Sequence, residues 1–567
     1  MKEMSDQTRM IVFVVLVVAI TFIWSHFFTP AVPPASQQKP AVSSVQTAPA
    51  QSGSTQGSGT ASAVAASAAP GAPITTIQAS AEKLIDIDSS LYHVQISNRG
   101  GVVRSWKLKK YLDDQTPSHP LELVNQDAAL QLGWPFSLVL PDAQLQERVN
   151  SGLYEVTPAG ENVSAPATIT LHWSDGHLDV TKKLAFGADY QLSVEVSATL
   201  DGKPLQPALA WRGGFGDRAV YKAAQFVTVF YKQSDKLTLL QYKKLGVSGN
   251  QSQPAQQAGP LQFGGIEDQF FAVTFIPDGS DLSLWHWTQN HPVNGASEPE
   301  AEMAVGPVSP GPLEARLYIG PKDLALLGKV QPSLEELVQF GWLGVISKPL
   351  LFVLQWAHRY VPNWGWAIVA FTVGLTMVLL PVRIWTFRSA RKMQLVAPEI
   401  KSIQERYKKY SMNDPRKRKM NEEVMAVYQR EGVNPVGSCL PMLVQFPILF
   451  AFYRMLQGSI ELRHAPWLWI HDLSAKDPYY ILPVAMVVTS YLMTKMTPMP
   501  ATTDPAQQRM MLLMPVFMGF IFFNLSSGLN LYYFASNLGQ VVQQWYLNRT
   551  HPLPSRSKFK RNKENKE

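Results

Sequence analysis

Long apolar runs divide this chain into segments of very different character. The first run covers residues 10–28, and five more follow residue 363, at approximately 364–382, 436–459, 479–495, 510–525 and 529–547. At 1.5 Å of rise per residue, about 20 apolar residues in a helix span a hydrocarbon core of about 30 Å. The pattern predicts six transmembrane helices. Residues 1–29 form an uncleaved anchor in this interpretation; a cleaved signal peptide is the alternative, although no small-residue cleavage site follows.

A different pattern fills residues 75–325. Apolar and polar residues alternate in LYHVQIS (91–97), ATITLHW (167–173) and YQLSVEVSATL (190–200), with Gly, Pro, Asn and Asp between such stretches. Alternation with a period of two is typical of strands that bury one face. The sequence therefore predicts a large antiparallel β-sandwich outside the membrane.

Two connecting segments join these parts. Residues 30–74 are rich in Pro, Ala, Ser, Gln and Gly with almost no charge, which predicts a flexible linker. Within 326–362, SLEELVQFGWLGVIS (333–347) begins with Ser333 as a helix cap and places two glutamates in its first turn. We predict an amphipathic helix on the membrane surface there; a helix docked on the β-sandwich is the alternative.

The distribution of charge sets the orientation. The chain carries a net charge of +7, and only 16% of its residues are charged. Residues 383–432 hold 13 Lys/Arg against 6 Asp/Glu, and residues 549–567 hold 7 against 2. Because Lys and Arg favour cytoplasmic loops, both segments and both termini are predicted to lie in the cytoplasm. The polytopic α-helical protein then keeps its β-sandwich on the other side of the membrane.

The sequence lacks the residue motifs on which several common classes of enzyme and metal site depend. Cys439 is the single cysteine, which excludes an intramolecular disulfide and any cysteine-built metal site. The chain has no G-x-x-x-x-G-K-[ST] loop for nucleotide phosphates and no H-E-x-x-H metal motif. We therefore expect a protein that is not an enzyme and that uses no cofactor or metal.

The predicted membrane helices carry polar residues instead of carboxylates. In the last segment, five polar residues follow one another at offsets of 0, 3, 7, 10 and 14 positions: Asn530, Tyr533, Asn537, Gln540 and Gln544. On a helix, these offsets place them within a stripe of roughly 80°. Such a stripe either joins helices or lines a hydrated cavity, and its length favours the cavity. Candidate lining residues on the other helices are Thr372, Thr376, Gln445, Tyr453 and Arg454.

Arg454 is the one basic residue placed well inside a predicted span, and an ionisable residue there indicates function. The alternative is that its long side chain reaches outward to the membrane surface. Arg383 and Lys495 lie at the inner ends of predicted spans, where a long side chain can extend to the membrane surface and keep its charge in water.

Residues 384–432 predict a cytoplasmic helical hairpin. Met393, Ile400, Ile403 and Tyr407 mark one arm, and Met420, Val424, Val427 and Tyr428 mark the other. The tip is basic, with Arg416, Lys417, Arg418 and Lys419. Attraction to anionic lipid explains this charge, and binding of ribosomal RNA or a targeting factor is the functional interpretation. The basic tail, 549–567, admits both interpretations too.

Four motifs give the C-terminal region a family resemblance: NPVGSCLPMLVQFPI (434–448), SIELRHAPWLWIHDLSAKDPYYILP (459–483), TDPAQQRMMLLMPVF (503–517) and SGLNLYY (527–533). With them the chain resembles the YidC/Oxa/Alb family of membrane insertases, strongly over 330–548. The anchor, linker and β-domain resemble the layout of its Gram-negative members in the inner membrane.

This resemblance implies a five-helix core (363–548) around a cationic hydrophilic groove that is open to cytoplasm and lipid. It implies insertion and folding of membrane proteins, alone or beside the Sec translocon, without nucleotide hydrolysis. Its implied partners are nascent membrane proteins, the Sec translocon, the ribosome or signal recognition particle machinery, and anionic phospholipids. We expect a monomer.

One departure from the family pattern concerns the groove's cation. Family members usually carry an arginine four residues after a functional threonine; here Thr372 matches the threonine, but Thr376 occupies the arginine position. We hypothesise that Arg454, on the facing helix, replaces that charge. A small-anion transporter using Arg454 and a scaffold whose β-domain binds envelope components are the rival functions.

Overall fold

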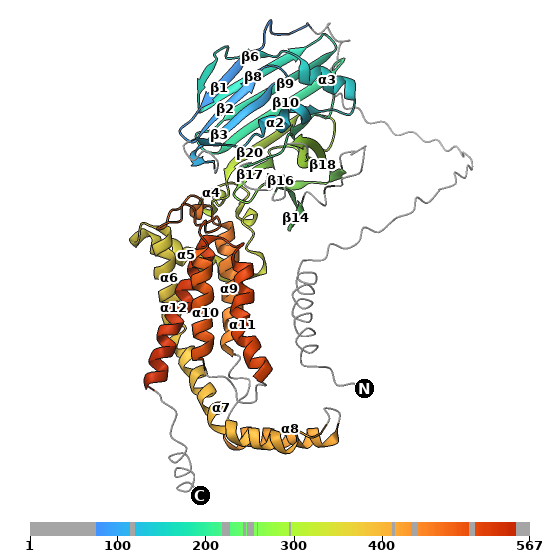
Figure 1. Cartoon of the computed structure of the whole chain (residues 1–567). Helices are drawn as coiled ribbons and strands as arrows, with labels where there is room; N and C mark the ends of the chain where they lie inside the picture. Colours follow the sequence, from blue (N-terminus) through green and yellow to red (C-terminus); the bar gives the residue numbers. More distant parts are fainter. Residues whose placement is uncertain are drawn as a thin grey trace, which may run out of the picture. The chain divides into compact units, whose positions relative to one another are not determined.

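The computed structural model describes residues 75–113, 119–217, 227–241, 245, 255–257, 259–293, 296–410, 414–432, 440–497 and 505–550. The predicted anchor, the linker and the tail after Thr550 lie outside these residues. The described chain contains a β-rich part up to Pro321 and a helical part after it (Figure 1). We call residues 75–321 the β-domain.

The β-domain contains three sheets. The first has the order β4-β3-β2-β1-β7, from β1 (Leu84–Asp88), β2 (Tyr92–Ser97), β3 (Val102–Leu112), β4 (Pro120–Glu122) and β7 (Asn162–Ser164). The third has the order β15-β18-β19-β12-β5, from β5 (Leu138–Val139), β12 (Ala208–Trp211), β15 (Ala255–Gln257), β18 (Leu282–Val293) and β19 (Ala296–Pro307).

The second sheet is the largest, with ten strands in the order β14-β13-β16-β17-β20-β10-β9-β8-β6 and β11 beside β10. Its strands are β6 (Glu155–Thr157), β8 (Ala167–Ser174), β9 (Leu178–Phe186), β10 (Gln191–Leu200), β11 (Lys203–Pro204), β13 (Thr228–Gln233), β14 (Lys236–Gln241), β16 (Leu261–Glu267), β17 (Phe271–Pro277) and β20 (Leu313–Pro321). Three short helices accompany the sheets: α2 (Gln126–Leu132), α3 (Ala143–Ser151) and α4 (Leu324–Leu327).

The alternating stretches of the sequence are confirmed as strands β2, β8 and β10. The expectation of a simple antiparallel sandwich needs two corrections. The strands form three sheets, and β1 pairs with β7 in parallel. A parallel pair joins strands far apart in sequence, and single-strand periodicity carries no information about such pairing.

Strand β9 shows how the alternation builds the core, and also where it fails. Leu178, Val180, Leu184 and Phe186 are buried, as the pattern requires, but the inward position between them is Lys182. Its ammonium group donates to the carbonyl oxygens of Gly100, Gly101 and Phe136 at 2.7, 3.1 and 2.8 Å. Lys182 therefore ties the turn before β3 and the segment before β5 to the centre of the large sheet.

Burial lowers the pKa of Lys182 to about 7. The unfolded chain keeps a pKa of about 10.4, so between these values it binds more protons than the folded chain. Stability should therefore rise as the pH rises from 7 towards 10, and the gain should be about 2 kcal/mol between pH 7 and 9. Lys182→Met should remove this rise. Urea unfolding of the full chain in detergent, followed by proteolysis of the β-domain at pH 7 and 9, measures this change in stability. The same change with pH in wild type and Lys182→Met would contradict the lowered pKa of Lys182.

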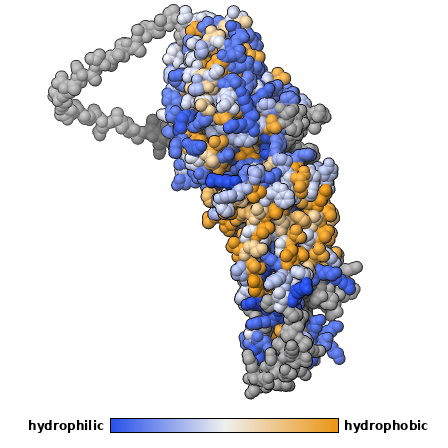
Figure 2. All heavy atoms as spheres, turned by 90° about the vertical axis from the view of Figure 1, so that its left-hand side faces the viewer, coloured by the Kyte–Doolittle hydropathy of each residue, from blue (hydrophilic) through white to orange (hydrophobic). Residues whose placement is uncertain are grey.

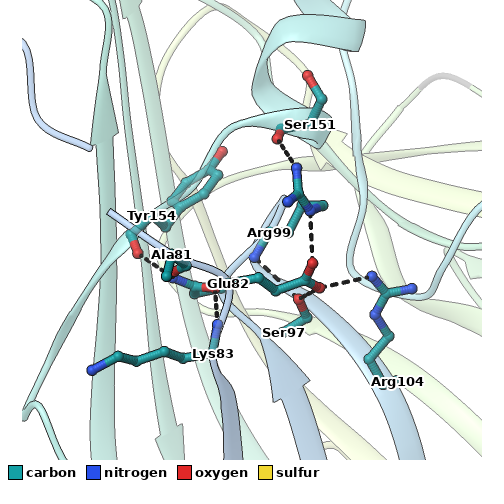
Figure 3. Close-up of polar contacts among 9 residues, drawn as sticks. Ala81, Glu82, Lys83, Ser97, Arg99, Arg104, Ser151 and Tyr154 are labelled. Atoms are coloured by element: carbon teal, nitrogen blue, oxygen red, sulfur yellow. Dashed lines mark hydrogen bonds and ion pairs between the residues drawn. The ribbon is translucent and has the colours of Figure 1, made fainter. Parts of the chain in front are cut away.

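A polar cluster fixes the start of the β-domain (Figure 3). The carboxylate of Glu82 accepts from Ser97 at 2.7 Å, from Arg99 at 2.8 Å and from Arg104 at 3.2 Å. These contacts lower the pKa of Glu82, chiefly through the hydrogen bond from Arg99. The cluster thus joins the chain before β1 to strands β2 and β3.

The helical part begins with two short 3₁₀ turns, η3 (Glu335–Leu337) and η4 (Gly341–Leu343), followed by α5 (Gly344–Tyr360). The amphipathic helix predicted over 333–347 therefore starts later, at Gly344. Leu334, Leu337, Val338 and Phe340 are buried instead, and they belong to the main apolar core. Two glycines interrupt that stretch, and Gly341 adopts a positive φ of 61°, which ends a helix.

The remaining helices are α6 (Trp364–Val378), α7 (Leu380–Arg406), α8 (Pro415–Arg430), α9 (Leu440–Gly458), α10 (Ile481–Met496), α11 (Pro505–Phe522) and α12 (Ser527–Thr550). They match the predicted apolar segments and the two hairpin arms within a few residues. Helices α6, α9, α10 and α12 run side by side (Figure 1). The hairpin arms pack as predicted, since all eight of the expected residues form one apolar cluster of their own.

A buried ion pair joins the β-domain to the connection between α9 and α10. Arg463 follows a short 3₁₀ turn (Ile460–Leu462) and donates to the carboxylate of Asp217; their side chains are 3% and 5% exposed. The guanidinium also lies 5.5 Å from the ring of Phe271. Nearby, Gln269 donates to the backbone oxygen of Gln457 at 3.1 Å. The ion pair thus joins the segment after β12 to the connection after α9, and a hydrogen bond joins the turn between β16 and β17 to the end of α9.

Candidate functional site

Polar side chains meet where α7, α10 and α12 approach one another. Asn537 donates to the hydroxyl of Ser490 at 2.6 Å, and Gln540 donates to Ser536 at 3.0 Å. Arg383 then donates to the side-chain oxygen of Gln540 at 2.7 Å and to its backbone oxygen at 3.2 Å. We call these five residues the polar seam.

The polar seam rests on helix spacing. Ser536 and Gln540 lie four residues apart on one face of α12, so their side chains meet, while Asn537 contacts Ser490 of α10. Arg383 lies in the first turn of α7, and its guanidinium also contacts the sulfur of Met493 on α10 at 3.3 Å. Its Nε is buried and has no hydrogen-bond partner among the described residues. The seam therefore holds a partly buried cation surrounded by amides and hydroxyls.

The sequence provides this cation with no nearby carboxylate. Residues 364–398, 481–497 and 505–550, which include α6, α10, α11, α12 and the first half of α7, contain no Asp or Glu. The charge of Arg383 is thus compensated only by dipoles within these helices. Such a site attracts an incoming anion.

The predicted amide stripe is divided between two roles. Asn537 and Gln540 belong to the polar seam, and Gln544 donates to the backbone oxygen of Met496 at 3.5 Å. Asn530 is fully buried and donates to the backbone oxygens of Phe522, Leu525 and Ser526, at 3.1 to 3.3 Å. It closes the turn between α11 and α12, while Tyr533 packs edge-on against Phe522.

The two threonines of α6 bond within their own helix. Thr372 is buried and donates to the carbonyl of Ile368 at 2.6 Å; Thr376 donates to that of Val373 at 2.8 Å. Gln543 of α12 also donates to the backbone oxygen of Thr376 at 3.3 Å. Position 376 therefore faces α12 next to the polar seam. Tyr453 is half-buried against the main core, and the side chain of Gln445 lies outside the described part of the chain.

The structure does not bring Arg454 to the polar seam. Arg454 is exposed, on the face of α9 that also exposes Phe446 and Phe450. The cation that contacts the amides of α12 is Arg383, which sequence reasoning had explained as a residue reaching to the membrane surface. A signal in the sequence does point to these contacts. Gln540 and Asn548 are eight residues apart, as are Arg383 and Arg391, so two amides on one helix can pair with two arginines on another.

The hairpin tip exposes part of its charge and pairs the rest. Arg416 is paired with Asp414 at 3.0 Å and lies 3.9 Å from the ring of Tyr410. The hydrogen bond from Arg416 lowers the pKa of Asp414. Arg418 lies 3.9 Å from Glu422, and both are largely exposed. Lys417 is half-buried, and Lys419 is exposed.

The helices expose a large apolar surface. Figure 2 shows hydrophobic atoms gathered over the helical part of the chain and hydrophilic atoms over the β-domain. The large exposed side chains on α6, α10, α11 and α12 include Val373, Val378, Val484, Val488, Phe517, Phe520, Ile521, Leu538 and Val542. Among the described residues, none of the helices alone has both the length and the hydropathy of a membrane span. Helices α5 and α6 have them only as a pair, with a bend of 119° between them.

In the described ranges, no group of three or more His, Cys, Asp or Glu side chains is arranged to hold a metal ion.

Comparisons with known proteins cover nearly the whole chain. Residues 84–353 match the family described as "YidC periplasmic domain", and residues 356–554 match "60Kd inner membrane protein". The membrane protein insertase YidC of Burkholderia multivorans is 32% identical, across 93% of this chain and 97% of its own length. That of Methylobacillus flagellatus is 31% identical, across 96% and 97%. The chain belongs to the YidC family of membrane protein insertases.

Among solved structures, the chain is similar to an active YidC insertase crystal structure with its first transmembrane domain resolved. The two share 18% identity over 84% of this chain and 95% of that one, with a TM-score of 0.35. The family resemblance seen in the sequence motifs is confirmed by the YidC relatives. The β-domain of this chain is accordingly the periplasmic domain of a YidC insertase.

Proposed function

We propose that this chain inserts proteins into the inner membrane through a hydrated groove whose cation is Arg383. The observation that carries this proposal is the contact of Arg383 with Gln540, among helices that contain no carboxylate. The groove lies between α6, α7, α10 and α12 and opens to cytoplasm and lipid. Thr372, Thr376, Tyr453, Asn537 and Gln540 belong to its lining or its support.

The groove acts on the barrier to insertion, because no bond is made or broken. A polar segment that enters hydrocarbon loses water, and each unsatisfied backbone group then costs several kcal/mol. Amides and hydroxyls of the polar seam replace some of the lost hydrogen bonds. Arg383 attracts acidic segments of the client, and the client's apolar segment moves into lipid along the exposed apolar faces of α10 and α11.

The remaining features follow from this proposal. Six helices span the membrane, both termini and the α7–α8 hairpin lie in the cytoplasm, and α5 lies on the periplasmic surface. The monomer works alone or beside the Sec translocon and helps clients to fold. Arg416, Lys417, Arg418 and Lys419 approach the ribosome or signal recognition particle machinery, or anionic phospholipids.

Reconstitution tests this function. Purified full chain in liposomes should insert a single-span client so that its translocated tail resists external protease. Empty liposomes and liposomes with unfolded chain are the controls. Flux of a small anion without insertion would instead support a transporter and overturn the proposal.

A further inference from the structure

A second cationic group lies beyond the polar seam, between α7 and the end of α12. Arg391 donates to the side-chain oxygen of Asn548 at 3.0 Å, and its guanidinium lies 5.0 Å from the ring of Phe387. Asn548 is held in place because it accepts from Gln544 at 3.2 Å and donates to the backbone oxygen of Met496 at 3.2 Å. The Nε of Arg391 is buried and finds no hydrogen-bond partner in the described ranges. A fixed guanidinium thus retains unused hydrogen-bonding capacity.

Three further cations are close in sequence to Arg391 or to Asn548, its partner on α12. Arg388 and Lys392 are exposed, and Arg388 lies three residues before Arg391 and four before Lys392, so it neighbours both on the surface of α7. Arg549, next to Asn548 on α12, is exposed too. We call Arg388, Arg391, Lys392, Asn548 and Arg549 the headgroup site.

The helices that carry these cations supply no free carboxylate in the described ranges near the site. The carboxylate that follows in α7, Glu399, is already engaged by Arg430, whose Nη2 lies 2.6 and 2.8 Å from its two oxygens. No Asp or Glu precedes it as far back as residue 364, and residues 505–550 contain none. Within these ranges of α7, α11 and α12, the four clustered cations therefore have no carboxylate partner.

A tryptophan precedes the cations on each helix. Trp385 lies one turn before Arg388 and is 53% exposed; Trp545 lies one turn before Arg549 and is 52% exposed. The guanidinium of Arg549 is 5.4 Å from the ring of Trp545. Tryptophan prefers the boundary between hydrocarbon and headgroups, so the cations that follow lie at the level of the phosphates.

We propose that the headgroup site binds the phosphate of an anionic phospholipid from the cytoplasmic leaflet. The proposal rests on the orientation given under Proposed function. Arg391 and Asn548 form the fixed base of the site, and the three exposed cations close around the phosphate. The paired tryptophans favour a lipid over free phosphate, because a lipid needs contacts at both the polar and the apolar level and free phosphate does not. Bound lipid would tie α7 to the end of α12.

Native mass spectrometry of the purified full chain tests the site. Cardiolipin, phosphatidylglycerol and phosphatidylcholine are added in detergent, and the bound fraction of each is measured. The test variant is Arg388→Gln/Arg391→Gln/Lys392→Gln. The matched control is Lys401→Gln/Lys408→Gln/Lys409→Gln, which removes the same charge from exposed positions further along the chain. We expect about tenfold less anionic lipid on the test variant, wild-type levels on the control, and weak binding of phosphatidylcholine throughout.

Three results would overturn the lipid site. The first is equal retention of anionic lipid by the test and control variants. The second is displacement of the lipid by millimolar inorganic phosphate, which would identify a site for phosphate alone. A third result is a lower yield of cross-links to an acidic client in the test variant with unchanged lipid binding. It would identify a client carboxylate as the ligand of the site. The milder Arg391→Lys should keep binding, which separates the site from misfolding. If wild-type protein inserts no client in liposomes, the proposed function fails, whatever the lipid result.

Discussion

Arg383→Gln is expected to reduce insertion of clients with acidic translocated tails by about tenfold or more. A hydrogen bond to a charged group contributes about 1.5–3 kcal/mol, and 1.4 kcal/mol corresponds to a factor of ten. Glutamine keeps a polar side chain beside Gln540 but removes the charge, so clients with neutral tails should lose much less. The measurement is protease protection of matched acidic and neutral clients in liposomes.

Arg454→Gln is the matched control, because it removes the same charge from the exposed face of α9. We expect it to have less than a twofold effect, and Arg383→Lys to retain most activity with acidic clients. The opposite ranking, with Arg454→Gln crippled and Arg383→Gln active, would restore the hypothesis that Arg454 replaces the family's arginine. Equal loss for acidic and neutral clients would show that Arg383 supports the fold of the bundle without acting on clients.

Arg463→Met is expected to destabilise the contact between the periplasmic domain and α9 by about 3–5 kcal/mol. The substitution leaves the carboxylate of Asp217 buried without its guanidinium, and breaking a buried pair from one side typically costs this much. Thermal unfolding of the full chain in detergent measures the loss. Arg430→Met is the control, since its pair with Glu399 is half exposed and such pairs contribute about 0–1 kcal/mol.

A double variant separates the ion pair from simple packing. Asp217→Asn combined with Arg463→Met removes both charges, so it should recover much of the stability that Arg463→Met loses. If the double variant is as unstable as the sum of the single ones, the two groups do not interact, and the contact between Gln269 and Gln457 carries the junction.

The sequence predicted the helices and the hairpin well, because each of them follows from local periodicity. Met393, Ile400, Val427 and Tyr428 repeat at helical spacing, and they pack as expected. The prediction of a helix over 333–347 was wrong because its leucines are buried by contacts with distant residues. A helix on the membrane surface and a segment docked on a core have the same spacing of apolar residues, so the sequence does not distinguish them. The third sheet and the parallel β1–β7 pair depend on long-range pairing that no single stretch encodes.

The site was predicted less completely than the fold. The stripe on α12 showed which face is polar, and Asn537 and Gln540 do meet polar partners there. It did not distinguish Asn530, which closes a turn, because an amide's partners depend on neighbouring chains. The position of Arg383 near a helix end suggests contact with water, whereas in the structure its guanidinium reaches Gln540 of α12.

The separate apolar cluster of the α7–α8 hairpin has a consequence for how the molecule works. Its six buried residues pack against one another and do not belong to the core that holds α6, α9 and α12. A pair of helices with its own core can swing as one lever about the remainder of α7 while the bundle keeps its packing. A large partner that pulled on the hairpin would therefore move its two helices as one unit and leave Arg383, in the first turn of α7, in contact with Gln540.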